Sequence, residues 1–80
     1  MTGKIRELNG EQKEKIAELR SITGAKIAEA RIFLDEKIKQ SGDRPEFAET
    51  VAEAKRAFQD DKERLERKLE EEIARVKEGR

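Results

Sequence analysis

Clustered carboxylates and scattered hydroxyls are the side chains of this 80-residue sequence with the clearest potential for chemistry. Paired carboxylates can act as general acid and base or bind a metal ion, and a hydroxyl can act as a nucleophile. The carboxylate clusters are Asp60-Asp61 and Glu70-Glu71-Glu72. The hydroxyls belong to Thr2, Ser21, Thr23, Ser41 and Thr50.

Neither group has the partners that such chemistry needs. The sequence contains no His and no Cys, so the usual activator of a hydroxyl, the commonest metal ligand and any thiolate are missing. Consecutive residues of a helix point in different directions, so three adjacent Glu cannot converge on one ion, and no calcium-loop spacing occurs. We expect the hydroxyls to cap helices or lie on the surface. The sequence therefore predicts no catalytic residue, no metal site, no cofactor and no enzymatic activity.

The charge balance argues against nucleic acid and membrane partners. Nineteen Lys and Arg oppose nineteen Asp and Glu, giving a formal net charge of zero. Residues 1–40 hold nine basic and seven acidic groups and residues 41–80 hold ten and twelve, so no basic stripe forms. The longest run of large apolar residues is Ile32-Phe33-Leu34, far short of the ~20 residues that span a bilayer. With no signal sequence after Met1, we expect a soluble protein of cytoplasmic type.

The apolar residues recur with the period of a helix throughout the sequence. The sequence contains seventeen large apolar side chains, and residue pairs that typically break helices separate the periodic segments at Asn9-Gly10, Thr23-Gly24 and Ser41-Gly42. Pro45 suits the first turn of a helix. The sequence therefore predicts an all-α fold in which residues 1–80 form one compact domain. Four or five helices are expected, at about 3–8, 11–22, 24–40, 45–58 and 61–78.

The last two helices could instead be one. The apolar stripe from Phe47 to Val76 averages about 3.6 residues per step and stays in phase, which favours a continuous helix. Against continuity, residues 59–64 contain no apolar side chain, and Asp60 followed by Glu63 resembles an N-terminal capping box. We expect a break near residues 59–61, with one continuous helix as the alternative.

The helix at 24–40 is predicted to be the central element. Ile27, Leu34 and Ile38 lie within about 40° of one another on a helical wheel, whereas Ile32 lies more than 100° away. Apolar residues spread so widely indicate neighbours on several sides, although Ile32 could simply be exposed. The expected core comprises Ile16, Leu19, Ile27, Leu34, Ile38, Phe47, Val51, Phe58, Leu65, Leu69 and Ile73.

Residues 16–34 carry a local resemblance to a known family. Leu19-Arg20, then Thr23-Gly24-Ala25, then an acidic, a small and a basic residue at 29–31 resemble the ubiquitin-associated-like N-terminal module of elongation factor Ts. This resemblance implies that Thr23, Gly24 and Ala25 mark a partner-binding loop. The alternative is that Thr-Gly makes a short connection between two helices, with Thr23 as a cap.

The whole chain resembles a computationally designed, idealised helical protein. Its surface is filled with Glu, Lys and Arg, and Gly and Pro occur only at the predicted helix boundaries. This resemblance implies a stand-alone, thermostable, monomeric scaffold that has no biochemical activity and requires no partner. Two alternatives stay open. One is a small ubiquitin-associated-like binding module, and the other is a self-associating protein that forms a homodimer through Leu65, Leu69, Ile73 and Val76.

Overall fold

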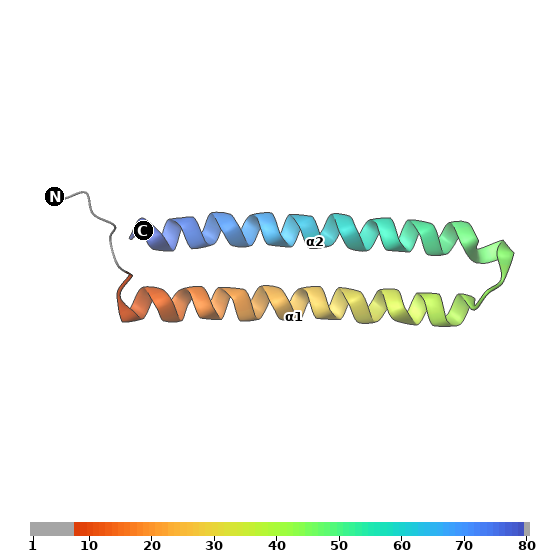
Figure 1. Ribbon diagram of the computed structural model, residues 1–80, viewed down its shortest axis with the longest axis horizontal. Coiled ribbons are helices and arrows are strands. Elements are labelled where there is room, and N and C mark those ends of the chain that lie inside the picture. Colours follow the sequence, from red (N-terminus) through yellow and green to blue (C-terminus); the bar gives the residue numbers. More distant parts are fainter. Residues whose placement is uncertain (1–7, 80) are drawn as a thin grey trace.

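The computed structural model describes residues 8–79, and these form a hairpin of two long helices (Figure 1). Helix α1 spans Gly10–Ser41, a short 3-10 helix η1 spans Pro45–Phe47, and helix α2 spans Ala48–Lys77. The helices lie side by side and run in opposite directions, giving a rod of 64 × 19 × 16 Å. No strand occurs among the described residues, so the predicted all-α class is confirmed.

A capping box starts α1. The Asn9 side chain accepts a hydrogen bond from the backbone N–H of Gln12 at 2.7 Å, and the Gln12 side chain accepts one from the backbone N–H of Asn9 at 3.0 Å. These two bonds satisfy backbone donors that the first turn of a helix otherwise leaves unpaired. The Asn9-Gly10 pair thus opens a helix.

The turn between the helices depends on Gly42 and Pro45. Gly42 has a φ of 61° and a ψ of −148°, a region that only glycine enters readily, and its N–H still donates to the carbonyl of Ile38 at 3.0 Å. Pro45 opens η1, where its missing N–H costs nothing. The Phe47 N–H then donates to the carbonyl of Arg44 at 3.1 Å, and α2 follows directly.

Among residues 8–79, two long helices and the short η1 replace the four or five helices that were predicted. Thr23-Gly24 does not end a helix but lies in the middle of α1, because one interior glycine costs only about 1 kcal/mol relative to alanine. The break expected near residues 59–61 is also wrong, since α2 is continuous there. Residues 3–7 of the first predicted helix lie outside the described part of the chain, and Leu8 precedes α1 without helical structure.

The helix expected at 24–40 is not the centre of a bundle. It is the second half of α1, and among residues 8–79 its helical neighbour is α2 alone. The apolar residues on its other sides consequently remain exposed: Ile32 is 59% exposed. The alternative interpretation of Ile32, simple exposure, is the one that the structure supports.

The two helices meet along a seam with an unusually regular spacing. Apart from Glu72, the buried and half-buried residues of both helices are separated by repeating steps of four, three and four. On α1 the seam comprises Gln12, Ile16, Leu19, Thr23, Ile27, Ala30, Leu34, Ile38 and Ser41. From α2 and η1 it comprises Phe47, Val51, Ala54, Phe58, Lys62, Leu65, Leu69, Ile73 and Val76.

Steps of four, three and four repeat every 11 residues. Eleven residues in three turns give about 3.67 residues per turn, slightly more than the 3.6 of an ideal helix. Such a seam does not require the left-handed supercoil that a seven-residue repeat imposes. Figure 1 accordingly shows two nearly straight helices.

The core along this seam is thin. All eleven predicted core residues are buried or half-buried, which confirms the apolar pattern. Only four apolar side chains of the described chain are buried, however, and each keeps 5–9% of its surface exposed: Ile16, Leu34, Phe58 and Ile73. Two helices cannot enclose a side chain on every side, so part of each core residue still meets water.

Candidate functional site

The carboxylate clusters lie outside the seam, and they do not share one side of α2: Asp61 and Glu72 each line a hollow between the two helices. Asp60, Asp61, Glu70 and Glu71 are exposed and Glu72 is half-buried. The Asp61 carboxylate pairs with the guanidinium of Arg64 one turn away. No three acidic side chains of the described chain gather as the ligands of a metal ion would.

The buried hydroxyls have structural positions. Thr23 and Ser41 are 9% and 8% exposed and both lie on the seam. The Ser41 hydroxyl donates to the carbonyl of Lys37 at 2.9 Å in the last turn of α1. Thr23 lies among mainly apolar seam residues and lines a hollow together with Lys26, Lys68 and Glu72.

Thr23, Gly24 and Ala25, the predicted binding residues, do not form a loop. All three lie inside α1, with Thr23 facing α2 and with Gly24 and Ala25 exposed. The expectation of a partner-binding loop here was wrong because α1 continues through it. A short connection capped by Thr23 is wrong for the same reason.

The stripe predicted for homodimer formation is occupied within the hairpin. Ile73 is buried, and Leu65, Leu69 and Val76 are half-buried on the seam against α1. Near the open end of the hairpin, the Gln12 side-chain amide donates to the carbonyl of Val76 at 2.8 Å. These four side chains therefore already have a neighbour in the same chain.

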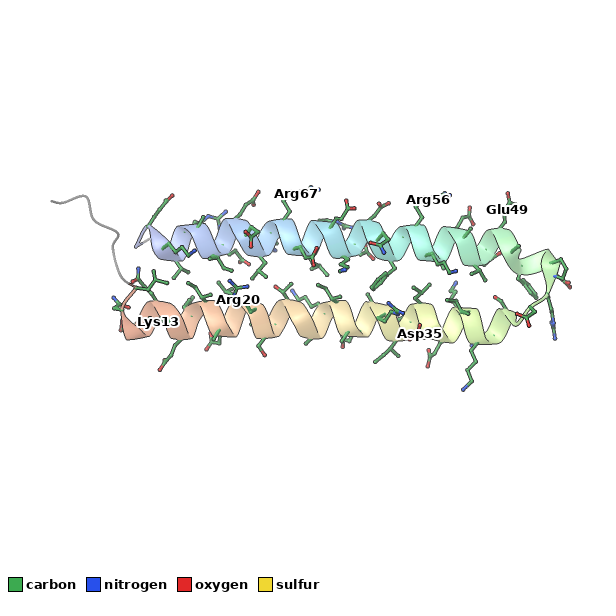
Figure 2. The ribbon with its side chains drawn as sticks, in the orientation of Figure 1. Lys13, Arg20, Asp35, Glu49, Arg56 and Arg67 are labelled. Atoms are coloured by element: carbon green, nitrogen blue, oxygen red, sulfur yellow. The ribbon has the colours of Figure 1, made fainter. Side chains whose placement is uncertain are left out.

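The apolar surface that remains open belongs to α1. Three large apolar side chains of the described chain are strongly exposed: Ile22 at 51%, Ile32 at 59% and Phe33 at 69%. The outer face of α2 is different, and Figure 2 shows Glu49, Arg56 and Arg67 pointing away from α1 along it. The hairpin thus has one charged outer side and one side that presents apolar groups.

Two hollows on one flank of the hairpin are bordered by Phe33 and Ile22, respectively. The first is lined by Ala30, Phe33, Leu34 and Lys37 of α1 and by Ala54, Ala57, Phe58 and Asp61 of α2. The second is lined by Leu19, Ile22, Thr23, Lys26, Leu65, Lys68 and Glu72. On both helices the seven residues of the second lie 11 positions from counterparts in the first, so the hollows are successive repeats of one groove.

Sequence comparison places this groove in no known family. No family model, no curated protein and no solved structure matches the chain. The site is therefore interpreted from its own chemistry. In the described part of the chain, neither helix is apolar over a stretch long enough to cross a bilayer.

The flank of the hairpin opposite the groove is polar. The Arg31 guanidinium lies 3.3 Å from the Asp35 carboxylate and 5.7 Å from the centre of the Phe58 ring. A cation over an aromatic face is attracted by the ring quadrupole. This flank has no strongly exposed large apolar side chain among the described residues, so the groove flank is the candidate interaction surface.

Sequence reasoning missed two of the three exposed residues. Ile22 follows Ile16 and Leu19 at steps of three residues, which suggests one helical face, but two such steps turn the helix about 120° away from Ile16. The seam steps of four and three instead select Thr23. Phe33 follows Ile22 by 11 residues, and this spacing is the signal that places both on one face.

Proposed function

We propose that this chain is a non-enzymatic structural protein that acts by associating with a second copy of itself. The observation that carries the proposal is the exposure of Ile22, Ile32 and Phe33, at 51%, 59% and 69%, on one helix of a two-helix hairpin. Two of these residues, Ile22 and Phe33, line one groove together with charged residues, and apolar grooves rimmed by polar residues are typical of interaction sites. The lining of the groove consists mainly of alanine, leucine and lysine side chains, with Asp61 and Glu72 as its carboxylates, and it offers chiefly apolar contact.

The thin core supports the same proposal. Only four apolar side chains are buried among residues 8–79, whereas small domains without disulfides or metals usually need further burial or oligomerisation to be stable. A second copy would supply that burial. The zero formal net charge also favours association, because no long-range repulsion separates two copies.

Sedimentation equilibrium over a hundredfold range of concentration tests this function. We expect the molar mass to rise from 9.2 kDa towards twice that value, and the thermal midpoint to rise with concentration, because association stabilises the folded state by mass action. A mass of 9.2 kDa and a constant midpoint at every concentration would refute the proposal.

A stand-alone designed scaffold is the second candidate function. The observation that favours it is the regularity of the hairpin: both helices repeat the same 11-residue seam, and a full capping box opens α1. Regular elements with deliberate caps are typical of idealised proteins. A monomer at all concentrations that keeps its helical circular dichroism close to the boiling point of water would support this candidate over self-association.

A further inference from the structure

One stripe of exposed residues runs along the groove flank of α1. It consists of Glu18, Ile22, Lys26, Glu29, Phe33 and Lys37, and we refer to it as the flank stripe. At 100° per residue all six lie within an arc of about 100°. Each is exposed, and the stripe contains Ile22 and Phe33, the two strongly exposed apolar residues that line the paired hollows of the groove.

The spacing of the flank stripe is the same in both directions. The steps are four, four, three, four and four residues. A second α1 laid antiparallel on the first, with a two-fold axis between residues 27 and 28, therefore places stripe residues opposite stripe residues. In this register Ile22 faces the partner's Phe33, Lys26 faces the partner's Glu29, and Glu18 faces the partner's Lys37.

The side chains match in every one of these pairs. One pair is apolar with apolar, and the other two join opposite charges. A two-fold interface uses the same patch on both copies, so each pair occurs twice. We infer that the second copy docks on the flank stripe with α1 antiparallel to α1, an inference that rests on the proposed self-association.

Other arrangements of the same stripe are mismatched or join less apolar surface. An antiparallel pairing shifted by 11 residues pairs Ile22 with Ile22 and Glu18 with Lys26, or Phe33 with Phe33 and Glu29 with Lys37, but it leaves the other large apolar residue opposite a charged one. A parallel pairing puts Lys26 on Lys26 and Glu29 on Glu29, and like charges at close range are unfavourable. An antiparallel pairing shifted by seven residues in one direction puts Ile22 opposite Lys26, and a shift in the other direction puts Phe33 opposite Glu29. The register centred between residues 27 and 28 is the one that joins the two large apolar residues.

The shape of the groove fits this register. The hollow next to Phe33 is lined by three alanines, Ala30, Ala54 and Ala57, and such short side chains leave room for a side chain from outside. In the inferred register the partner's Ile22 approaches Phe33 and therefore reaches this hollow. Ile32, the third exposed apolar residue, shares a neighbouring hollow with Phe33, so it borders the same interface.

Charge reversal at Lys26 and Glu29 tests the inference. Lys26→Glu alone introduces two repulsive contacts into the homodimer, each between the new carboxylate of one copy and Glu29 of the other. Glu29→Lys alone likewise sets two repulsions, each between the introduced ammonium group and Lys26. We expect each single variant to dimerise about tenfold more weakly than the wild type. The double variant Lys26→Glu/Glu29→Lys restores both attractions and is expected to regain wild-type affinity.

An equimolar mixture of the two single variants provides a second readout. In the mixed dimer both facing pairs join a carboxylate with an ammonium group, so we expect the mixed dimer to predominate over either homodimer. Native mass spectrometry with one variant isotope-labelled measures this preference. Arg56→Glu on the outer face of α2 (Figure 2) is the matched control and should leave the affinity unchanged.

The ways in which the test can fail are distinct. A wild type that never dimerises refutes the proposed self-association, and the inference falls with it. A wild type that dimerises, whose single variants keep its affinity and whose mixed dimer is no tighter than the wild type, places the interface elsewhere and overturns the inference alone. If the single and double variants all dimerise with the affinity of the wild type and the mixed dimer is tighter than the wild-type dimer, the pairing is parallel and the antiparallel one is overturned. Circular dichroism at low concentration confirms that each variant is as helical as the wild type.

Discussion

Replacing Gly24 by alanine tests the continuity of α1 most directly. Gly24 is exposed, lies within the helix, and has no positive φ. A Cβ built on it meets no atom within 4 Å beyond its own helix and neighbours. Alanine is therefore free of strain at this position, and it removes the conformational freedom that glycine gives the unfolded chain.

The expected gain follows from helix propensity. Glycine in a helix interior is less favourable than alanine by about 0.8–1.0 kcal/mol, so Gly24→Ala should raise the free energy of unfolding by that amount. For a domain of this size, a gain of about 1 kcal/mol corresponds to a rise of about 4–8 °C in the thermal midpoint. Urea unfolding followed by far-UV circular dichroism measures the difference. Both proteins must be compared at one concentration, because association also adds stability.

Gly42→Ala is the matched control. Gly42 has a φ of 61° in the turn after α1, and a residue with a Cβ is strained there by about 1–3 kcal/mol. We expect this variant to lose stability although its Cβ also meets no atom within 4 Å. If Gly24→Ala were neutral or destabilising, Gly24 would have to terminate a helix, and the single helix α1 would be refuted.

Three further comparisons probe the seam and the cap by urea unfolding. Phe58→Ala removes a buried aromatic ring and should lower the free energy of unfolding by about 3–5 kcal/mol. Phe33→Ser, on the exposed flank, should leave the stability of the monomer nearly unchanged while weakening association. Equal losses of stability in the two variants would contradict this contrast. Thr23→Val replaces a hydroxyl that faces α2 and is expected to stabilise by about 1 kcal/mol, and a loss would show that the hydroxyl has a needed partner. Asn9→Ala removes the capping box and should cost about 1 kcal/mol, so an unchanged midpoint would mean that the first turn is frayed.

The seam could be predicted from the sequence because it depends on many residues at once. Five apolar positions in α1 and six in η1 and α2 agree on the seam, and a small error at any one of them does not change the pattern. The turn around Gly42 and Pro45 was predictable for a different reason, since two residues with restricted conformational roles coincide there.

The two false helix breaks came from local signals that were too weak. Gly24 costs about 1 kcal/mol in a helix, which packing of the flanking turns against α2 outweighs. The polar stretch at residues 59–64 leaves no gap in the seam, because Lys62 is half-buried there and its aliphatic stem can cover apolar surface. Asp60 and Glu63, which resemble a capping box, are equally well accommodated as solvated residues in the middle of a helix.

The candidate site was harder to predict than the seam. Ile32 stood apart from the main apolar face in the sequence, and its position could mean either an extra neighbour within the chain or none. The number of helices decides between them, and that number depended on the two weak break signals. Once α1 and α2 are each continuous, no further described helix exists to cover Ile22, Ile32 and Phe33.

The 11-residue repeat makes the hairpin adjustable in length. Inserting 11 residues into α1 and 11 at the facing level of α2 would add three whole turns to each helix, or about 16 Å of rod. Every residue beyond the insertion would return to its original face, and the groove would gain another hollow of the same kind. The length of the rod could thus be changed in steps of one repeat, while the seam between the two helices keeps its register.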